Sequence, residues 1–136
     1  MKKILISMLF IAISSTSLLA DRATANANAI ITAIYLEGYG YTIQDISGRH
    51  LRTNHYRTYN RYLYSGTCYA IASIGDDDVR DLDIQVWDRN WNYITSDSDS
   101  SKTAVVEVCP RYSGTYRFRT RMYSGSGYFR MIMGWK

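Results

Sequence analysis

The chain lacks the common signatures of catalysis, because it contains no G-x-S-x-G, no H-E-x-x-H and no phosphate-binding loop. Histidine is scarce: His50 and His55 are the only two, and no third residue is spaced to complete a metal site with them. We therefore expect a protein that is not an enzyme. One catalytic alternative stays open, a small secreted hydrolase in which His50 or His55 acts as a base beside an aspartate.

Beyond the first twenty residues, the chain has no apolar run long enough to span a bilayer. Residues 1–20 combine Lys2 and Lys3 with an apolar run and a small-residue exit, which is the build of a secretory signal peptide. Cleavage after Ala20, which we favour, and cleavage after Ala25 both fit. No cysteine lies near either point to carry a lipid anchor. We expect a secreted or periplasmic protein with no membrane span after processing.

Cysteine is equally rare, with only Cys68 and Cys109. In an exported protein, a single pair of cysteines favours a disulfide bond over reactive thiols. The bond would close a loop of about 40 residues and add roughly 4 kcal/mol to the free energy of unfolding in the chain-entropy model. Neither cysteine lies in a cysteine-hydrolase signature.

Net charge is low once the leader is removed. Taking residues 1–20 from 136 leaves 116, enough for one domain with one core. Losing Lys2 and Lys3 lowers the formal charge from +4 to +2, so we do not expect a nucleic-acid partner. The charges are unevenly placed, since residues 76–99 carry eight Asp against two Arg and the chain after Glu107 is basic. We expect these two segments to face each other, and we expect a monomer.

Short alternating segments dominate what remains. In the clearest one, Leu82, Ile84 and Val86 alternate with polar residues and Trp87. Similar segments follow at turn spacings of about ten residues and do not alternate with helices, which predicts a mainly β fold, an antiparallel jelly-roll-like β-sandwich. An Ala-rich stretch over residues 27–37 predicts a short helix. The expected divisions are a signal peptide over 1–20, a helix and linker over 21–48, and the sandwich over 49–136.

A series of short motifs carries a resemblance to a known family. The motifs, in order, are Leu63-Tyr64-Ser65-Gly66-Thr67-Cys68-Tyr69, Gly75-Asp76, Asp81-Leu82-Asp83-Ile84, Trp87-Asp88, Ser113-Gly114-Thr115-Tyr116 and Tyr123-Ser124-Gly125-Ser126-Gly127-Tyr128. Over residues 62–135 the chain resembles the bacterial pre-peptidase C-terminal domain. The resemblance implies a jelly-roll-like sandwich of the kind appended to secreted proteases, some of which bind collagen, other polymers or calcium. No peptidase domain precedes the match, so we expect a stand-alone module.

The acidic segment supplies a second alternative, a calcium-stabilised structural domain. Its candidate metal ligands lie in two turns and are Asp76, Asp77, Asp78, Asp97 and Asp99. Calcium takes six to eight oxygen ligands, which adjacent carboxylates supply if the two turns lie at one end of the sandwich. The spacing of an EF-hand is missing. Solvated turns are the competing interpretation, and no other cofactor is expected.

A stripe of arginines follows on a later strand. Arg117, Arg119 and Arg121 alternate with Phe118, Thr120 and Met122 and therefore share one face. The stripe suits an anionic polymer, or cross-strand ion pairs with Asp81 and Asp83. We favour the ion pairs because they explain the charge asymmetry.

Aromatic residues interleaved with arginines form the candidate ligand-binding site. Its members are Tyr56, Tyr59, Tyr62, Arg57, Arg61, Trp87 and Trp91. Tyrosine and tryptophan rings anchor interfaces and stack on sugars, and guanidinium groups bind acidic or hydroxylated groups. We expect a binding or surface-interaction module whose ligand is a polysaccharide or an envelope or extracellular protein.

Overall fold

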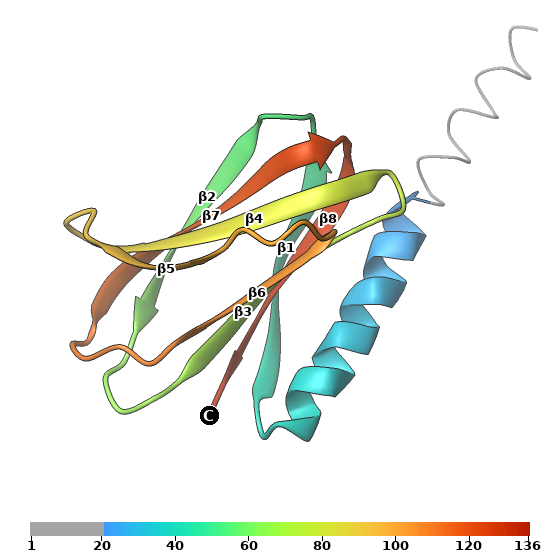
Figure 1. Cartoon of the computed structure of the whole chain (residues 1–136). Coiled ribbons are helices and arrows are strands. Elements are labelled where there is room, and N and C mark those ends of the chain that lie inside the picture. The colour runs from blue at the N-terminus through green and yellow to red at the C-terminus, as the bar shows by residue number, and fades with distance from the viewer. Residues whose placement is uncertain (1–20) are drawn as a thin grey trace, which may run out of the picture.

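The computed structural model describes residues 21–136 (Figure 1). The expected signal peptide over residues 1–20 therefore lies outside the described residues. Between residues 21 and 136, no helix is long and apolar enough to cross a membrane. A helix over residues 21–38 precedes eight strands, which confirms the mainly β fold class.

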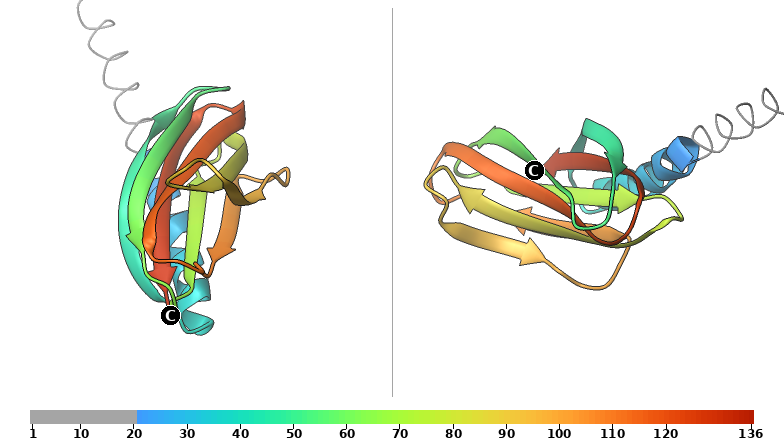
Figure 2. Two further views of the ribbon diagram at one scale, coloured as in Figure 1. Left: turned by 90° about the vertical axis from the view of Figure 1, so that its left-hand side faces the viewer. Right: turned by 90° about the horizontal axis from the view of Figure 1, so that it is seen from above.

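The strands form two antiparallel four-stranded sheets packed as a sandwich, seen most clearly in Figure 2. Their bounds are β1 Thr42–Leu51, β2 Tyr56–Leu63, β3 Tyr69–Gly75, β4 Val79–Asp88, β5 Tyr93–Asp97, β6 Thr103–Val108, β7 Gly114–Gly125 and β8 Gly127–Trp135. One sheet has the order β1-β8-β3-β6, and the other has the order β2-β7-β4-β5. The core between the sheets includes the fully buried side chains of Phe118, Phe129, Leu82 and Met122.

The sandwich begins before the boundary expected at residue 49. β1 pairs with β8 from Thr42 opposite Trp135 to Leu51 opposite Gly127, so residues 42–48 belong to the sheet and are not a linker. The register shifts between Asp45 and Ser47. Such an irregularity interrupts the period of two by which a strand is recognised in sequence.

The N-terminal helix covers the outer side of the β1-β8-β3-β6 sheet (Figures 1 and 2). Ala29 and Leu36 of the helix join a buried cluster with Ala70, Ala72 and Ile74 of β3. Every residue of β3 is buried in consequence, because one face meets the core and the other meets the helix. The expected helix over 27–37 lies inside the observed one.

A left-handed glycine ends the helix. Gly40 has φ of 89°, and its N–H donates to the Glu37 carbonyl at 2.9 Å. Glycine takes this conformation without the steric cost of a Cβ, as at many helix C-termini.

The turn between β3 and β4 is organised by a buried carboxylate. Asp76 has no exposed surface. Its Oδ1 accepts the N–H of Asp78 at 2.9 Å, and its Oδ2 accepts the N–H of Tyr128 at 2.8 Å. A Cβ on Gly127 would collide with the Asp76 carboxylate. Asp76 therefore holds the start of β8 against the acidic turn.

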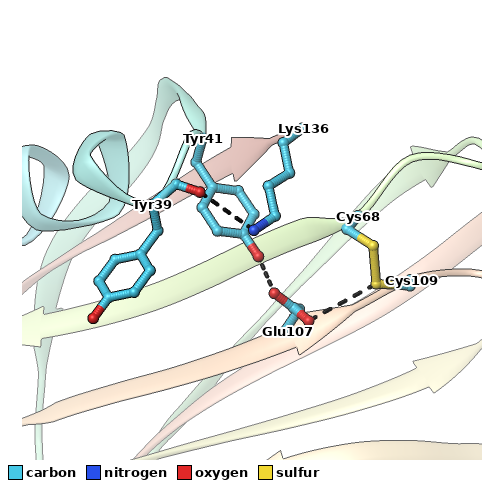
Figure 3. The surroundings of a disulfide bond; sticks show 6 residues. All are labelled: Tyr39, Tyr41, Cys68, Glu107, Cys109 and Lys136. Carbon is cyan, nitrogen blue, oxygen red and sulfur yellow. Dashed lines mark hydrogen bonds between the residues drawn. A yellow bond between two sulfur atoms is a disulfide. The ribbon is translucent and has the colours of Figure 1, made fainter.

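The disulfide between Cys68 and Cys109 is confirmed, with a Cα–Cα distance of 4.1 Å (Figure 3). It joins the residue before β3 to the residue after β6, at the end where Cys68 also exchanges backbone hydrogen bonds with Lys136. Beside it, Tyr41 donates a hydrogen bond to Glu107 (Figure 3). Burial, together with this hydrogen bond and the charge of Glu107, raises the pKa of Tyr41 to about 12. A persistent disulfide indicates an extracytoplasmic compartment.

We predict that replacing both cysteines, Cys68→Ser with Cys109→Ser, lowers the free energy of unfolding by about 4 kcal/mol, because the 41-residue separation leaves a long loop unconstrained in the unfolded chain. Urea denaturation of the wild type with and without a reductant provides the control, and reduction should reproduce the loss. A change below about 1 kcal/mol in both experiments would contradict the structural role of the bond.

We also predict that Asp76→Asn lowers the free energy of unfolding by about 2–4 kcal/mol. Both carboxylate oxygens of Asp76 accept a backbone N–H, and the asparagine would place its NH₂ group against one of these donors. Asp77→Asn is the matched control. Asp77 is exposed and makes only a surface ion pair with Lys102 at 3.1 Å, so its loss should change stability by less than about 0.5 kcal/mol. Equal urea midpoints for the two variants would show that Asp76 does not organise the turn.

Candidate ligand-binding site

The exposed face of the β2-β7-β4-β5 sheet carries the arginine stripe at its centre. Side chains alternate along β7, so Phe118, Thr120 and Met122 enter the core while Arg117, Arg119 and Arg121 point outward. On one side of β7, β2 places Asn60, Thr58 and Tyr56 opposite the three arginines. On the other side, β4 places Trp87, Gln85 and Asp83 opposite the same arginines.

The guanidinium groups stack on aromatic rings. The Arg119 guanidinium lies 4.3 Å from the centroid of the Tyr56 ring and 4.8 Å from that of Trp87. The Arg117 guanidinium lies 4.4 Å from the centroid of Trp91. The rings of Trp87 and Trp91 meet edge to face at 5.7 Å. We call these five residues, Tyr56, Trp87, Trp91, Arg117 and Arg119, the Arg/aromatic face.

The β4–β5 turn fixes the position of Trp91. Asp88 Oδ1 accepts the backbone N–H groups of Asn90 at 2.8 Å and Asn92 at 2.9 Å, and Oδ2 accepts the Asn92 side-chain amide at 2.8 Å. The bond from the Asn92 side chain, followed by the backbone bonds, lowers the pKa of Asp88. Trp91 has φ of 64°, an uncommon conformation for a bulky residue. Arg117 donates to the Arg89 carbonyl at 2.5 Å. The turn thus holds the indole over the sheet.

Arg119 is the least satisfied group of this face. Its Nε is buried and has no hydrogen-bond partner. Within residues 21–136, no acidic side chain forms an ion pair with it. Its interactions are with the rings of Tyr56, Trp87 and Trp91. A stacked guanidinium keeps its N–H groups in its own plane, where they are directed at neighbours other than the rings.

The structure brings together only part of the predicted site. Tyr56, Trp87 and Trp91 meet on the Arg/aromatic face. Tyr62 lies farther along the same face of β2, where it packs on Tyr64 with ring centroids 5.0 Å apart. Both Tyr56 and Tyr62 are 56% exposed.

The other predicted members lie on the opposite side of β2. Tyr59 is buried in the core, and its hydroxyl donates to Ser47 at 3.3 Å. Arg57 and Arg61 share its side of the strand, by the alternation of β2. Their assignment to one surface with Tyr56 was wrong, because neighbouring residues of a strand face opposite ways.

The expected ion pairs between the arginine stripe and Asp81 or Asp83 do not form among the described residues, where the one ion pair is Lys102–Asp77. Asp83 does lie opposite Arg121. The Arg121 guanidinium lies instead 5.4 Å from the Tyr123 ring centroid. Burial raises the pKa of Asp83, and the charge of Asp81 adds to the rise against the opposing effect of Arg121.

The arginines of β7 are therefore the site residues that sequence reasoning assigned wrongly. Their alternation with Phe118 and Thr120 gave the correct face. What it did not indicate was their neighbours, because the register against β2 and β4 is invisible in one sequence.

The candidate calcium ligands are used by the turns that contain them. Asp97 accepts the N–H groups of Val105 at 2.9 Å and Asp99 at 3.1 Å, and Asp77 pairs with Lys102. Among the described residues, Asp76 and Asp78 group instead with Asp21, with ligand atoms within 4.8 Å of one another. Asp97 and Asp99 are not members of this group.

Both histidines are exposed. The Nδ1 of His55 lies 3.2 Å from the carbonyl oxygen of Thr53. Within residues 21–136, neither histidine forms a hydrogen bond with a serine, a cysteine or a carboxylate. The hydrolase alternative thus has no nucleophile–base pair in this geometry.

Comparison with known proteins supports the fold. No known protein-family model matches the chain, and no curated protein sequence matches it. Among solved structures, it is similar to PliG of Aeromonas hydrophila, a periplasmic lysozyme inhibitor of g-type lysozyme, at 9% identity and a TM-score of 0.53 over 72% of this chain and 90% of that chain.

It is also similar to the pre-peptidase C-terminal domain of collagenase from Bacillus anthracis, at 14% identity and a TM-score of 0.52 over 71% of this chain and 89% of that chain. At such low identities the similarity concerns the fold alone. The resemblance of this chain to the pre-peptidase C-terminal domain is confirmed at that level, as a shared β-sandwich.

Proposed function

We propose that the protein is a non-catalytic, exported binding module whose Arg/aromatic face binds an acidic polysaccharide. The observation that carries the proposal is Arg119, which is held between the rings of Tyr56 and Trp87 and donates no hydrogen bond among the described residues. A cation fixed in this way, without an anionic partner among residues 21–136, is suited to an anion supplied from outside.

The chemistry of the face favours sugars that carry carboxylates or sulfates. Exposed Tyr and Trp rings offer flat apolar surfaces for sugar rings, and guanidinium groups bind pairs of anionic oxygen atoms through paired N–H donors. Because the aromatic rings already restrain the arginines, a ligand loses less side-chain entropy on binding than it would with free arginines.

The two solved structures described above support a non-catalytic role. One is a periplasmic inhibitor of g-type lysozyme, and the other is the pre-peptidase C-terminal domain of a collagenase. A lysozyme inhibitor has a protein partner, so an envelope or extracellular protein is the alternative ligand for this face.

We predict that the protein binds acidic polysaccharides such as alginate, polygalacturonate or heparin, and not neutral dextran, in affinity electrophoresis and calorimetry. Arg119→Gln and Trp87→Ala should each weaken the affinity about tenfold or more, which corresponds to about 1.4 kcal/mol. The affinity should fall with salt, as expected for charge-dependent binding.

Arg57→Gln is the matched control, because it removes the same charge from an exposed arginine on the other side of β2. Its affinity should stay within about twofold of the wild type. An equal loss of affinity in Arg57→Gln and Arg119→Gln would show that binding depends on net charge and not on the Arg/aromatic face. If the protein captured an envelope protein and no polysaccharide, and Arg119→Gln abolished that capture, the Arg/aromatic face would still be the binding site but its ligand would be a protein.

A further inference from the structure

A recess lies on the same exposed face of the sheet, and none of its lining residues belongs to the Arg/aromatic face. It has a volume of about 310 Å³ and is lined by Asp81, Asp83, Ser98, Ser100 and Tyr123. The aspartates come from β4, the serines follow β5, and the tyrosine comes from β7. All of its polar side chains offer oxygen atoms.

Two carboxylate oxygens of this recess are buried without a partner. Asp81 is 8% exposed, and its Oδ1 has no hydrogen bond. The Oδ1 of Asp83 is also buried and unpaired. Buried acceptors of this kind are rare in native proteins, because the loss of hydration is uncompensated. Two of them on alternate residues of one strand favour the binding of a cation.

The nearby cations of the chain are engaged elsewhere. Arg121, opposite Asp83 in register, lies over the Tyr123 ring and donates to Asn54 Oδ1 at 3.5 Å. Lys102 pairs with Asp77. The third carboxylate that acts on the recess, Asp97, is already bonded to two backbone N–H groups. The recess is therefore acidic, and no described side chain neutralises it through an ion pair.

We propose that Asp81 and Asp83 bind a calcium ion, with oxygen atoms of Ser98 or Ser100 and water completing its coordination. Calcium is a hard ion that takes oxygen ligands in flexible geometry, whereas magnesium requires a nearly ideal octahedron and retains its water. The recess is large enough for water ligands. Two carboxylates in an open site predict a dissociation constant of about 10⁻⁴–10⁻³ M, as in extracellular modules.

This site is distinct from the acidic turns that first suggested calcium. In those turns, Asp76–Asp78 and Asp97–Asp99, carboxylate oxygens of Asp76 and Asp97 accept hydrogen bonds from backbone N–H groups. By contrast, the buried Oδ1 atoms of Asp81 and Asp83 have no hydrogen-bond partner. The argument for calcium does not rest on polysaccharide binding, because it uses no residue of the Arg/aromatic face.

The test uses the protein purified with its disulfide intact, stripped with EDTA and dialysed. Titration with CaCl₂ at constant ionic strength should release or absorb heat in calorimetry. It should also raise the melting temperature by about 5 °C or more at 10 mM calcium. MgCl₂ should give a smaller shift.

Asp83→Asn should abolish both the heat and the shift. Asp81→Asn should do the same, but Asp83 is less buried, so its variant decides the matter if Asp81→Asn fails to fold. Asp99→Asn and Asp78→Asn are controls that remove the same charge from exposed aspartates and should retain both signals. Asp83→Asn should still bind the polysaccharide in EDTA, with an affinity no weaker than that of the wild type.

Three outcomes would overturn the proposal. The first is the absence of heat and shift in the wild type. The second is a calcium signal that survives Asp83→Asn. The third is a signal lost in Asp78→Asn and kept in Asp83→Asn, which would assign the ion to the group formed by Asp21, Asp76 and Asp78. Binding of an arginine-containing peptide in place of calcium would assign the recess to a basic side chain of a partner.

Discussion

The register between β4 and β7 is the constraint on which the rest of the exposed sheet depends. It is fixed by the inward residues, since Leu82 pairs with Met122 and Val86 with Phe118, and all four are fully buried. A slip of one residue would expose these side chains, which makes any other register costly. The same register places Trp87 beside Arg117 and Asp83 beside Arg121. The core thus decides which charges and rings meet on the surface.

Much of this fold could be predicted from sequence because the determining signals are local. The alternation around Ile84 indicated a strand with one buried face. The presence of only two cysteines behind a predicted export signal indicated a disulfide bond between them. The boundary at residue 49 was wrong because β1 loses its period at the irregularity between Asp45 and Ser47. Tyr59 was assigned to the ligand-binding surface because the segment is rich in tyrosine. In the strand, alternate tyrosines face the core and the solvent, and Tyr59 faces the core.

The charges were the hardest part to predict, because pairing depends on geometry across strands. Residues 76–99 carry eight aspartates and the chain after Glu107 is basic, and mutual neutralisation explained both. In the structure, the aspartates serve different purposes. Asp76, Asp88 and Asp97 bond to backbone N–H groups of turns, while Asp81 and Asp83 are left without counterions. The arginines stack on aromatic rings, which a count of opposite charges could not reveal.

The acidic recess and the Arg/aromatic face influence each other through charge, although they share no residue. Neighbouring strands lie about 4.8 Å apart, and charges are screened over about 8 Å at physiological ionic strength. Asp83 on β4 and Arg121 on β7 are therefore within range, and Arg121 opposes the rise in the pKa of Asp83. A divalent cation on Asp81 and Asp83 would remove negative charge from beside the stripe and raise its positive potential. An anionic ligand would then bind more tightly with calcium than without it, and by thermodynamic linkage the ligand would strengthen calcium binding by the same factor.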